Sequence, residues 1–146
     1  ISASDMLIDI SLYLIGAKLD PDVVTNIMGV APSSSRREGD PKIKGKLTPV
    51  HSTGLWMLSR SLRSDCVDKE VGVFLRDMSP TKIEHASAFA DSAFVDVFIA
   101  RTVAEEDLES SVEFELSKVT MTGLYELGLP ANFAVTNVAG ATSSDA

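Results

Sequence analysis

Alternating apolar and polar positions predict five β-strands, and the first runs from Leu7 to Ile15. Between Ser92 and Val103 one face is aliphatic, while the other carries Phe94 and Phe98, so this strand is expected to be central and covered on both sides. The cleanest half-buried alternation lies at 112–117 (Val-Glu-Phe-Glu-Leu-Ser). The pattern thus predicts strands over 7–15, 54–59, 92–103, 112–117 and 133–138.

Helical spacing and capping signals predict three helices between these strands. The first begins at Asp20-Pro21, with aspartate as N-cap and proline in the first turn, and ends at Gly29. The second is capped by Asp65, has an apolar stripe from Val67 to Met78 and ends at Ser79-Pro80. The third covers 121–127 and is closed by Gly128.

The resulting element order, β-α-β-α-β-β-α-β, predicts an α+β fold. Without its second helix, this order is that of the split βαβ or ferredoxin-like unit. We therefore expect a two-layer sandwich in which a mostly antiparallel five-stranded sheet carries the helices on one face.

The length of 146 residues and the apolar content of 45% indicate one globular domain. We expect it to span 1–138, with a disordered tail at 139–146. The connection at 31–53 has three prolines and two glycines and is expected to hold no regular element. Connections of this length are usually functional or disordered.

The net charge of −8 argues against nucleic acid as a partner, because phosphate binding needs a basic face. No apolar run approaches the roughly 20 residues that cross a bilayer, so no membrane partner is expected. The charge is segregated along the chain. Seven of the 13 Lys and Arg residues lie between Arg36 and Arg63, whereas 105–115 contains six acidic residues and no base.

Known catalytic and metal-binding patterns are missing from the sequence, so neither a catalytic set nor a cofactor is predicted. The glycine-rich stretch from Gly39 to Lys46 lacks the spacing, the hydroxyl residue and the preceding strand of a phosphate-binding loop. One cysteine and two histidines cannot form a structural zinc site. Cys66 falls near a helix start, where we expect it to be packed rather than reactive. A lone cysteine also favours a cytoplasmic location. The first residue is Ile1 and not a methionine, so other residues could precede it in the protein.

One constellation remains as a candidate site. Two adjacent arginines, a serine run (33–35) and a nearby tryptophan offer donors for an anion together with a surface for stacking. The alternative is that the tryptophan fills the core and an arginine pairs with a neighbouring acid to pin the loop. The candidate ligand- or partner-binding residues are Arg36, Arg37, Asp40, Thr53 and Trp56.

A set of short motifs occurs in order along the chain: Leu19-Asp20-Pro21, Ala31-Pro32, the basic run from Arg36 to Asp40, Thr53-Gly54-Leu55-Trp56 with Ser59, and Leu127-Gly128-Leu129-Pro130. With these motifs the chain resembles the bacterial family called domain of unknown function 4279 (DUF4279). The resemblance spans about residues 6–138, and a Glu-His pair typical of the family is replaced here by Asp68-Lys69-Glu70. It implies a shared fold and no established activity.

Three hypotheses for function follow. The first is a non-enzymatic protein-interaction domain of the small bacterial immunity or accessory kind, favoured by the segregated charge. The alternative is a domain that binds a small anionic ligand through the basic loop 36–46 and Trp56. An enzyme would have to assemble dispersed groups such as His51, Asp40 and Arg36.

Overall fold

A computed structural model describes residues 6–140. This part of the chain contains five strands, four α-helices and a 3₁₀ helix, η2. In chain order they are β1 (Met6–Gly16), α1 (Pro21–Met28), β2 (Ser34–Arg36), β3 (Gly54–Ser64), α2 (Val67–Arg76), α3 (Pro80–Ser87), β4 (Ser92–Val103), η2 (Glu105–Asp107), α4 (Lys118–Leu127) and β5 (Ala131–Ala139). The α+β class predicted from the sequence is confirmed.

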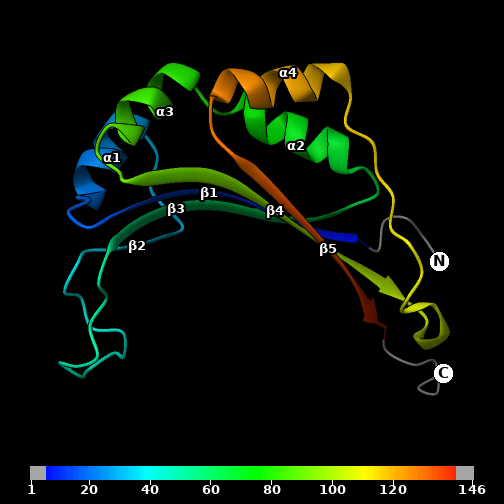
Figure 1. The fold of residues 1–146 in the computed structure, drawn as a ribbon, viewed down its shortest axis with the longest axis horizontal. Coiled ribbons are helices and arrows are strands. Elements are labelled where there is room, and N and C mark those ends of the chain that lie inside the picture. Colours follow the sequence, from blue (N-terminus) through cyan, green and yellow to red (C-terminus); the bar gives the residue numbers. More distant parts are fainter. Residues whose placement is uncertain (1–5, 141–146) are drawn as a thin grey trace.

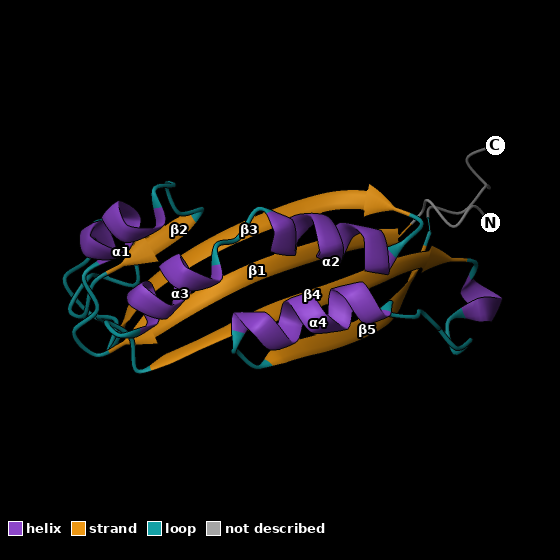
Figure 2. Ribbon diagram, turned by 90° about the horizontal axis from the view of Figure 1, so that it is seen from above, coloured by secondary structure: helices purple, strands orange, loops and turns teal. Residues whose placement is uncertain are grey.

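The strands form one mixed sheet in the order β2-β3-β1-β4-β5. Neighbouring strands are antiparallel except β4 and β5, which are parallel. The sheet is arched, and the four α-helices lie over its convex side, whereas no helix formed by residues 6–140 covers the concave side (Figures 1 and 2). The two ends of the arch are the 37–53 connection and the segment around η2 (Figure 1).

The core lies between the convex side of the sheet and the helices. Even-numbered residues of β1 from Ile8 to Leu14 are fully buried, as are Val97 and Ile99 of β4. They belong to one apolar cluster with Phe74 of α2 and Ile83 of α3. β4 is an interior strand, but the prediction that both its faces are covered is wrong, because Phe98 lies on the concave side and is 39% exposed.

The predicted limits of α1 are confirmed. The Asp20 carboxylate accepts the backbone N–H of Asp22 at 3.0 Å, and Gly29 ends the helix at a φ of 72°. The cap of α2 was predicted wrongly, since Cys66 is the N-cap, is exposed rather than packed and makes no side-chain capping bond.

The largest errors concern β2, α3 and residues 112–117. β2 lies within the connection predicted to be irregular, and α3 begins at Ser79-Pro80, which the sequence analysis interpreted as a helix end. Residues 112–117 form no strand; Phe114 packs against Phe133 of β5 at 5.7 Å between ring centroids, without a backbone ladder. Side-chain packing alone therefore accounts for that alternation.

The chain end also differs from the expectation. α4 starts at Lys118 with Ser117 as its cap, three residues earlier than predicted. β5 runs through Ala139, and the Gly140 N–H donates to the Val103 carbonyl at 2.9 Å, so the tail predicted at 139–146 does not begin at 139. Its remaining residues, 141–146, lie outside the described part. Between residues 6 and 140, no helix is both long and apolar enough to cross a membrane.

Candidate functional site

A narrow projection at one end of the arch contains Lys42, Lys44 and Lys46, three of the seven basic residues that the sequence places between Arg36 and Arg63. We call residues 39–51 the finger. Its two arms are joined by backbone hydrogen bonds from Gly39 to His51 (2.8 Å), from His51 to Asp40 (2.8 Å) and from Lys42 to Pro49 (2.9 Å). The finger thereby extends the hairpin formed by β2 and β3 and projects from the end of the sheet (Figure 1).

Two arginines fix the base of the finger. Arg37 pairs with Asp20 and Asp22 at the start of α1, both at 2.8 Å, while its backbone N–H donates to the Asp40 carboxylate at 2.8 Å. Arg36 donates through Nε to the Thr53 carbonyl at 3.3 Å. Four of the five predicted site residues (Arg36, Arg37, Asp40 and Thr53) therefore meet at this base, where Arg37 and Asp40 have partners within the chain and Arg36 is bonded through Nε.

The hydrogen bond from Arg37, followed by that from the Asp22 backbone, lowers the pKa of Asp20 below its ordinary value. Asp20 thus serves both as the cap of α1 and as the counter-ion of the finger base.

The fifth predicted residue, Trp56, does not lie at the site. Its side chain is fully buried in the core, and the indole N–H donates to the Thr25 hydroxyl of α1 at 3.0 Å. A ligand at the finger therefore cannot stack on the indole, and the alternative interpretation, in which Trp56 fills the core, describes its position.

The tip of the finger combines positive charge with exposed aliphatic side chains. Lys42, Lys44 and Lys46 alternate with Ile43, which is 49% exposed, and are followed by Leu47, which is 89% exposed. The aliphatic residues were not among the predicted site residues, although the alternation in Lys-Ile-Lys-Gly-Lys-Leu is a signal for them. Isolated exposed aliphatics are common, but next to three exposed lysines they form a contact surface of mixed character.

His51 adds little charge to this surface at neutral pH. Desolvation at the finger base, followed by the nearby charges of Arg36 and Lys42, lowers the pKa of its imidazole. The finger charge therefore comes from the three lysines.

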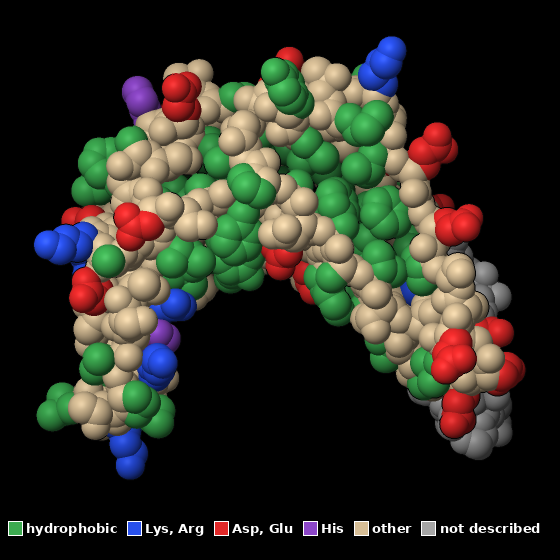
Figure 3. Space-filling model, in the orientation of Figure 1, with side chains coloured by type: hydrophobic (Ala, Val, Ile, Leu, Met, Phe, Trp, Pro, Cys, Tyr) green, Lys and Arg blue, Asp and Glu red, His purple; other side chains and the backbone are tan. Residues whose placement is uncertain are grey.

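The opposite end of the arch is acidic (Figure 3). It carries Glu105, Glu106 and Asp107 of η2, followed by Glu109. The segment is held to the sheet by the Asn137 amide, which donates to the carbonyls of Leu108 (2.9 Å) and Ser110 (2.7 Å). The basic and acidic segments, which are separate along the sequence, therefore also lie at opposite ends of the arch.

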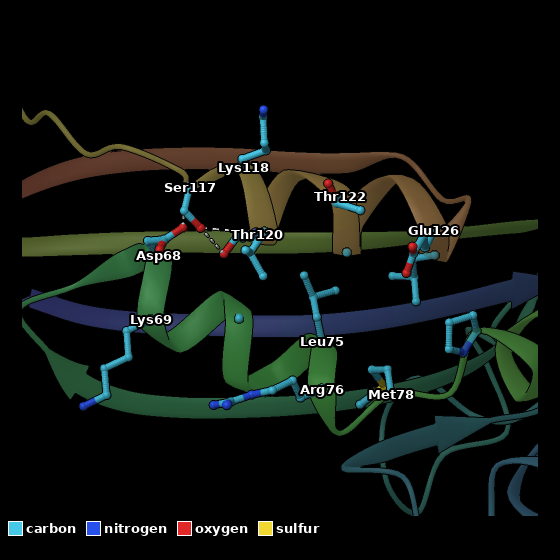
Figure 4. A pocket seen from close by; sticks show the side chains of 15 residues that line it. Asp68, Lys69, Leu75, Arg76, Met78, Ser117, Lys118, Thr120, Thr122 and Glu126 are labelled. Carbon is cyan, nitrogen blue, oxygen red and sulfur yellow. Dashed lines mark hydrogen bonds between the residues drawn. The ribbon is translucent and has the colours of Figure 1, made fainter.

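The largest cavity described, about 740 Å³, is a groove between α2 and α4 (Figure 4). At one end, the Asp68 carboxylate accepts the backbone N–H of Ser117 at 2.7 Å. This bond, followed by that from the Thr120 hydroxyl, lowers the pKa of Asp68. The Asp68 carboxylate therefore joins the starts of the two helices at this end of the groove.

The lowered pKa of Asp68 predicts an acid-dependent loss of stability. Its folded pKa lies below the unfolded value of 3.8, so its contribution is complete above that value and is lost as the pH falls through the folded pKa. In urea unfolding, Asp68→Asn is expected to be less stable than wild type at pH 7, with the difference shrinking below pH 3.8. The matched variant Asp65→Asn removes a carboxylate from an exposed neighbour without touching the bond to Ser117, and at pH 7 it should be less destabilising than Asp68→Asn. If Asp68→Asn lost the same free energy of unfolding at pH 7 as below pH 3.8, the result would contradict the prediction.

Together, the fold and its projections define an α+β domain with an arched mixed sheet, a basic finger and an acidic opposite end. The chain belongs to the family described as domain of unknown function (DUF4279), whose model matches residues 6–137. No curated protein and no solved structure shows a significant match to the chain. Three residues of the motifs shared with the family attach the finger to α1: Arg37 contacts both Asp20 and Asp40.

Proposed function

We propose that this domain is a protein-interaction module whose finger contacts an acidic surface of a partner protein. One observation carries the proposal: the finger presents three lysines and three exposed aliphatic side chains, Ile43, Leu47 and Val50, on a base that is pinned to α1. This is a non-enzymatic role of the small bacterial accessory or immunity kind. The two-layer, ferredoxin-like arrangement predicted from the sequence is a separate hypothesis on which this role does not depend.

The composition of the finger suits a protein surface. Complementary charge speeds encounter and rejects partners of the wrong sign, while the binding energy comes mainly from contacts that are fully desolvated at the centre of an interface. The finger is constrained before a partner binds: its arms are joined by backbone hydrogen bonds, and its base is held to α1 by Arg37. Less conformational entropy is therefore lost on binding.

A small anionic ligand has less support. That hypothesis needs free arginines and a stacking surface, but Arg37 already pairs with Asp20 and Asp22, and Trp56 is buried. None of the pockets described within residues 6–140 is lined by Lys42, Lys44 or Lys46.

The test compares two triple charge reversals. In the finger variant, Lys42, Lys44 and Lys46 become glutamate; in the control, Lys69, Lys82 and Lys118 on the helical side become glutamate, with the same change in net charge. A partner captured by wild type is identified, purified and titrated against each protein at two salt concentrations. We expect the finger variant to bind about tenfold or more weakly and the control to stay within about threefold of wild type.

Equal losses in the two variants would assign the effect to net charge and contradict the proposal, as would unchanged binding by the finger variant. Reversal of Arg36 and Arg37 is a poorer test, because it also removes the ion pairs that hold the finger to α1.

A further inference from the structure

The concave side of the sheet carries a second set of residues that the finger does not involve. The buried even-numbered residues of β1 face the helices, so its odd-numbered residues face the hollow seen beneath the arch (Figure 3). The strand registers arrange three residues from each of β3, β1 and β4 in three rows. The rows are Met57–Tyr13–Phe94, Ser59–Ser11–Asp96 and Ser61–Asp9–Phe98.

A pocket of about 340 Å³ lies over this grid. That volume is at the small end for ligand sites and matches one side chain better than a large molecule. The lining residues are Asp9, Ser11, Tyr13, Met57, Ser59, Ser61, Asp96 and Phe98.

The pocket is negatively charged, because it contains two carboxylates and no lysine or arginine. Asp9 lies opposite Phe98 and Asp96 opposite Ser11, so the carboxylates are diagonal neighbours across β1 and β4. Within residues 6–140, neither of them takes part in an ion pair. The pocket therefore has two negative charges that the described chain does not neutralise.

Serine hydroxyls hold the polar floor in place. The Ser61 hydroxyl donates to the Asp9 carboxylate, and the hydroxyls of Ser11 and Ser59 are hydrogen-bonded at 2.9 Å. The second carboxylate oxygen of Asp9 can accept a hydrogen bond from another donor. Asp96 lies next to Ser11, which is bonded to Ser59.

Aromatic rings border the carboxylates. Tyr13 and Phe94 are stacked with centroids 5.0 Å apart and planes 15° apart, and Phe98 is 39% exposed. A ring face attracts a cation, and a planar guanidinium can stack on a ring while donating to carboxylates. Carboxylates beside an exposed aromatic ring therefore favour a guanidinium over an anion or a neutral ligand.

We propose that this concave pocket binds the guanidinium group of an arginine side chain presented by a basic segment of a partner. Asp9 and Asp96 accept its hydrogen bonds, and the exposed ring of Phe98, which lies opposite Asp9, covers one planar face. The inference does not rest on the finger, which carries the opposite charge and lies at the end of the arch.

The test is an NMR titration of the ¹⁵N-labelled protein with N-acetyl-arginine-amide. Its matched probe is N-acetyl-citrulline-amide, which has almost the same shape and no charge. The arginine probe should cause saturable shifts in backbone amides of 9–13, 57–61 and 94–98, while the citrulline probe should cause little change. Asp96→Asn and Asp9→Asn should each weaken arginine binding about tenfold, as expected for a lost charged hydrogen bond.

The control Asp107→Asn removes the same charge at the acidic end of the arch and should leave the titration unchanged. The spectrum of each free variant shows whether it remains folded, and two substitutions at separate strands keep the test valid if one of them unfolds. Three results would overturn the proposal: no saturable shift, equal binding of citrulline, or an equal loss in the control. Tighter binding of N-acetyl-lysine-amide would overturn the guanidinium assignment.

Discussion

Replacement of Trp56 by alanine should lower the free energy of unfolding by about 3–5 kcal/mol. The side chain is fully buried in the apolar cluster, so its removal leaves a cavity that neighbouring side chains fill only in part. It also removes the indole N–H that donates to the Thr25 hydroxyl at 3.0 Å, a bond that joins β3 to α1. Urea unfolding followed by circular dichroism measures this loss without relying on tryptophan fluorescence.

The matched substitution is Tyr125→Ala, at an aromatic residue of α4 that is 85% exposed. Because little of its surface is buried, this change should stay within about 0.5 kcal/mol of wild type. A loss below about 1 kcal/mol for Trp56→Ala would show that the indole is not a core residue and would reopen its role in ligand binding.

The second large effect is expected at Gly54, where β3 begins. A Cβ at this position would lie 2.9 Å from the Leu19 carbonyl oxygen and 3.2 Å from that of Gly16. Both contacts are with backbone, so the turn that leads into α1 must move. Gly54→Ala should therefore cost about 1–3 kcal/mol, measured by the same unfolding experiment.

Gly72→Ala is the control of opposite sign. This glycine lies inside α2, and an added Cβ would meet only the Thr120 hydroxyl oxygen at an ordinary 3.5 Å. Alanine should thus stabilise the protein by about 0.5–1 kcal/mol, since it restricts the unfolded chain and favours the helix. A loss of stability at Gly72 together with no loss at Gly54 would contradict the packing described for both positions.

Elements with strong local signals were predictable from the sequence. The strict alternation of β1 and the Asp-Pro and Gly signals of α1 give their limits without any knowledge of neighbours. Residues 112–117 show the limit of this reasoning: alternation reports which side chains pack, whereas a strand also requires a partner backbone. Ser79-Pro80 suits a helix start as well as a helix end, and only tertiary packing of Ile83 decides between them.

The sequence predicted the candidate site as a charged region, but not which of its basic residues hold the finger and which are exposed at its tip. The sequence places arginines and lysines in one segment, and nothing local distinguishes Arg37, whose partners Asp20 and Asp22 precede it by 15 residues or more, from Lys44. The concave pocket was missed because its carboxylates come from β1 and β4, which are joined only by strand register. Such diagonal pairs exist only once the sheet has formed.

The opposed charges at the two ends of the arch make the molecule an electric dipole, which gives it a preferred direction of approach. In the field of a charged partner such a molecule rotates before contact, so that the end of opposite sign leads. Ions screen this torque over a Debye length of about 8 Å at physiological ionic strength. Added salt would then slow association through a loss of orientation, while the lifetime of a complex formed by aliphatic contacts would change much less.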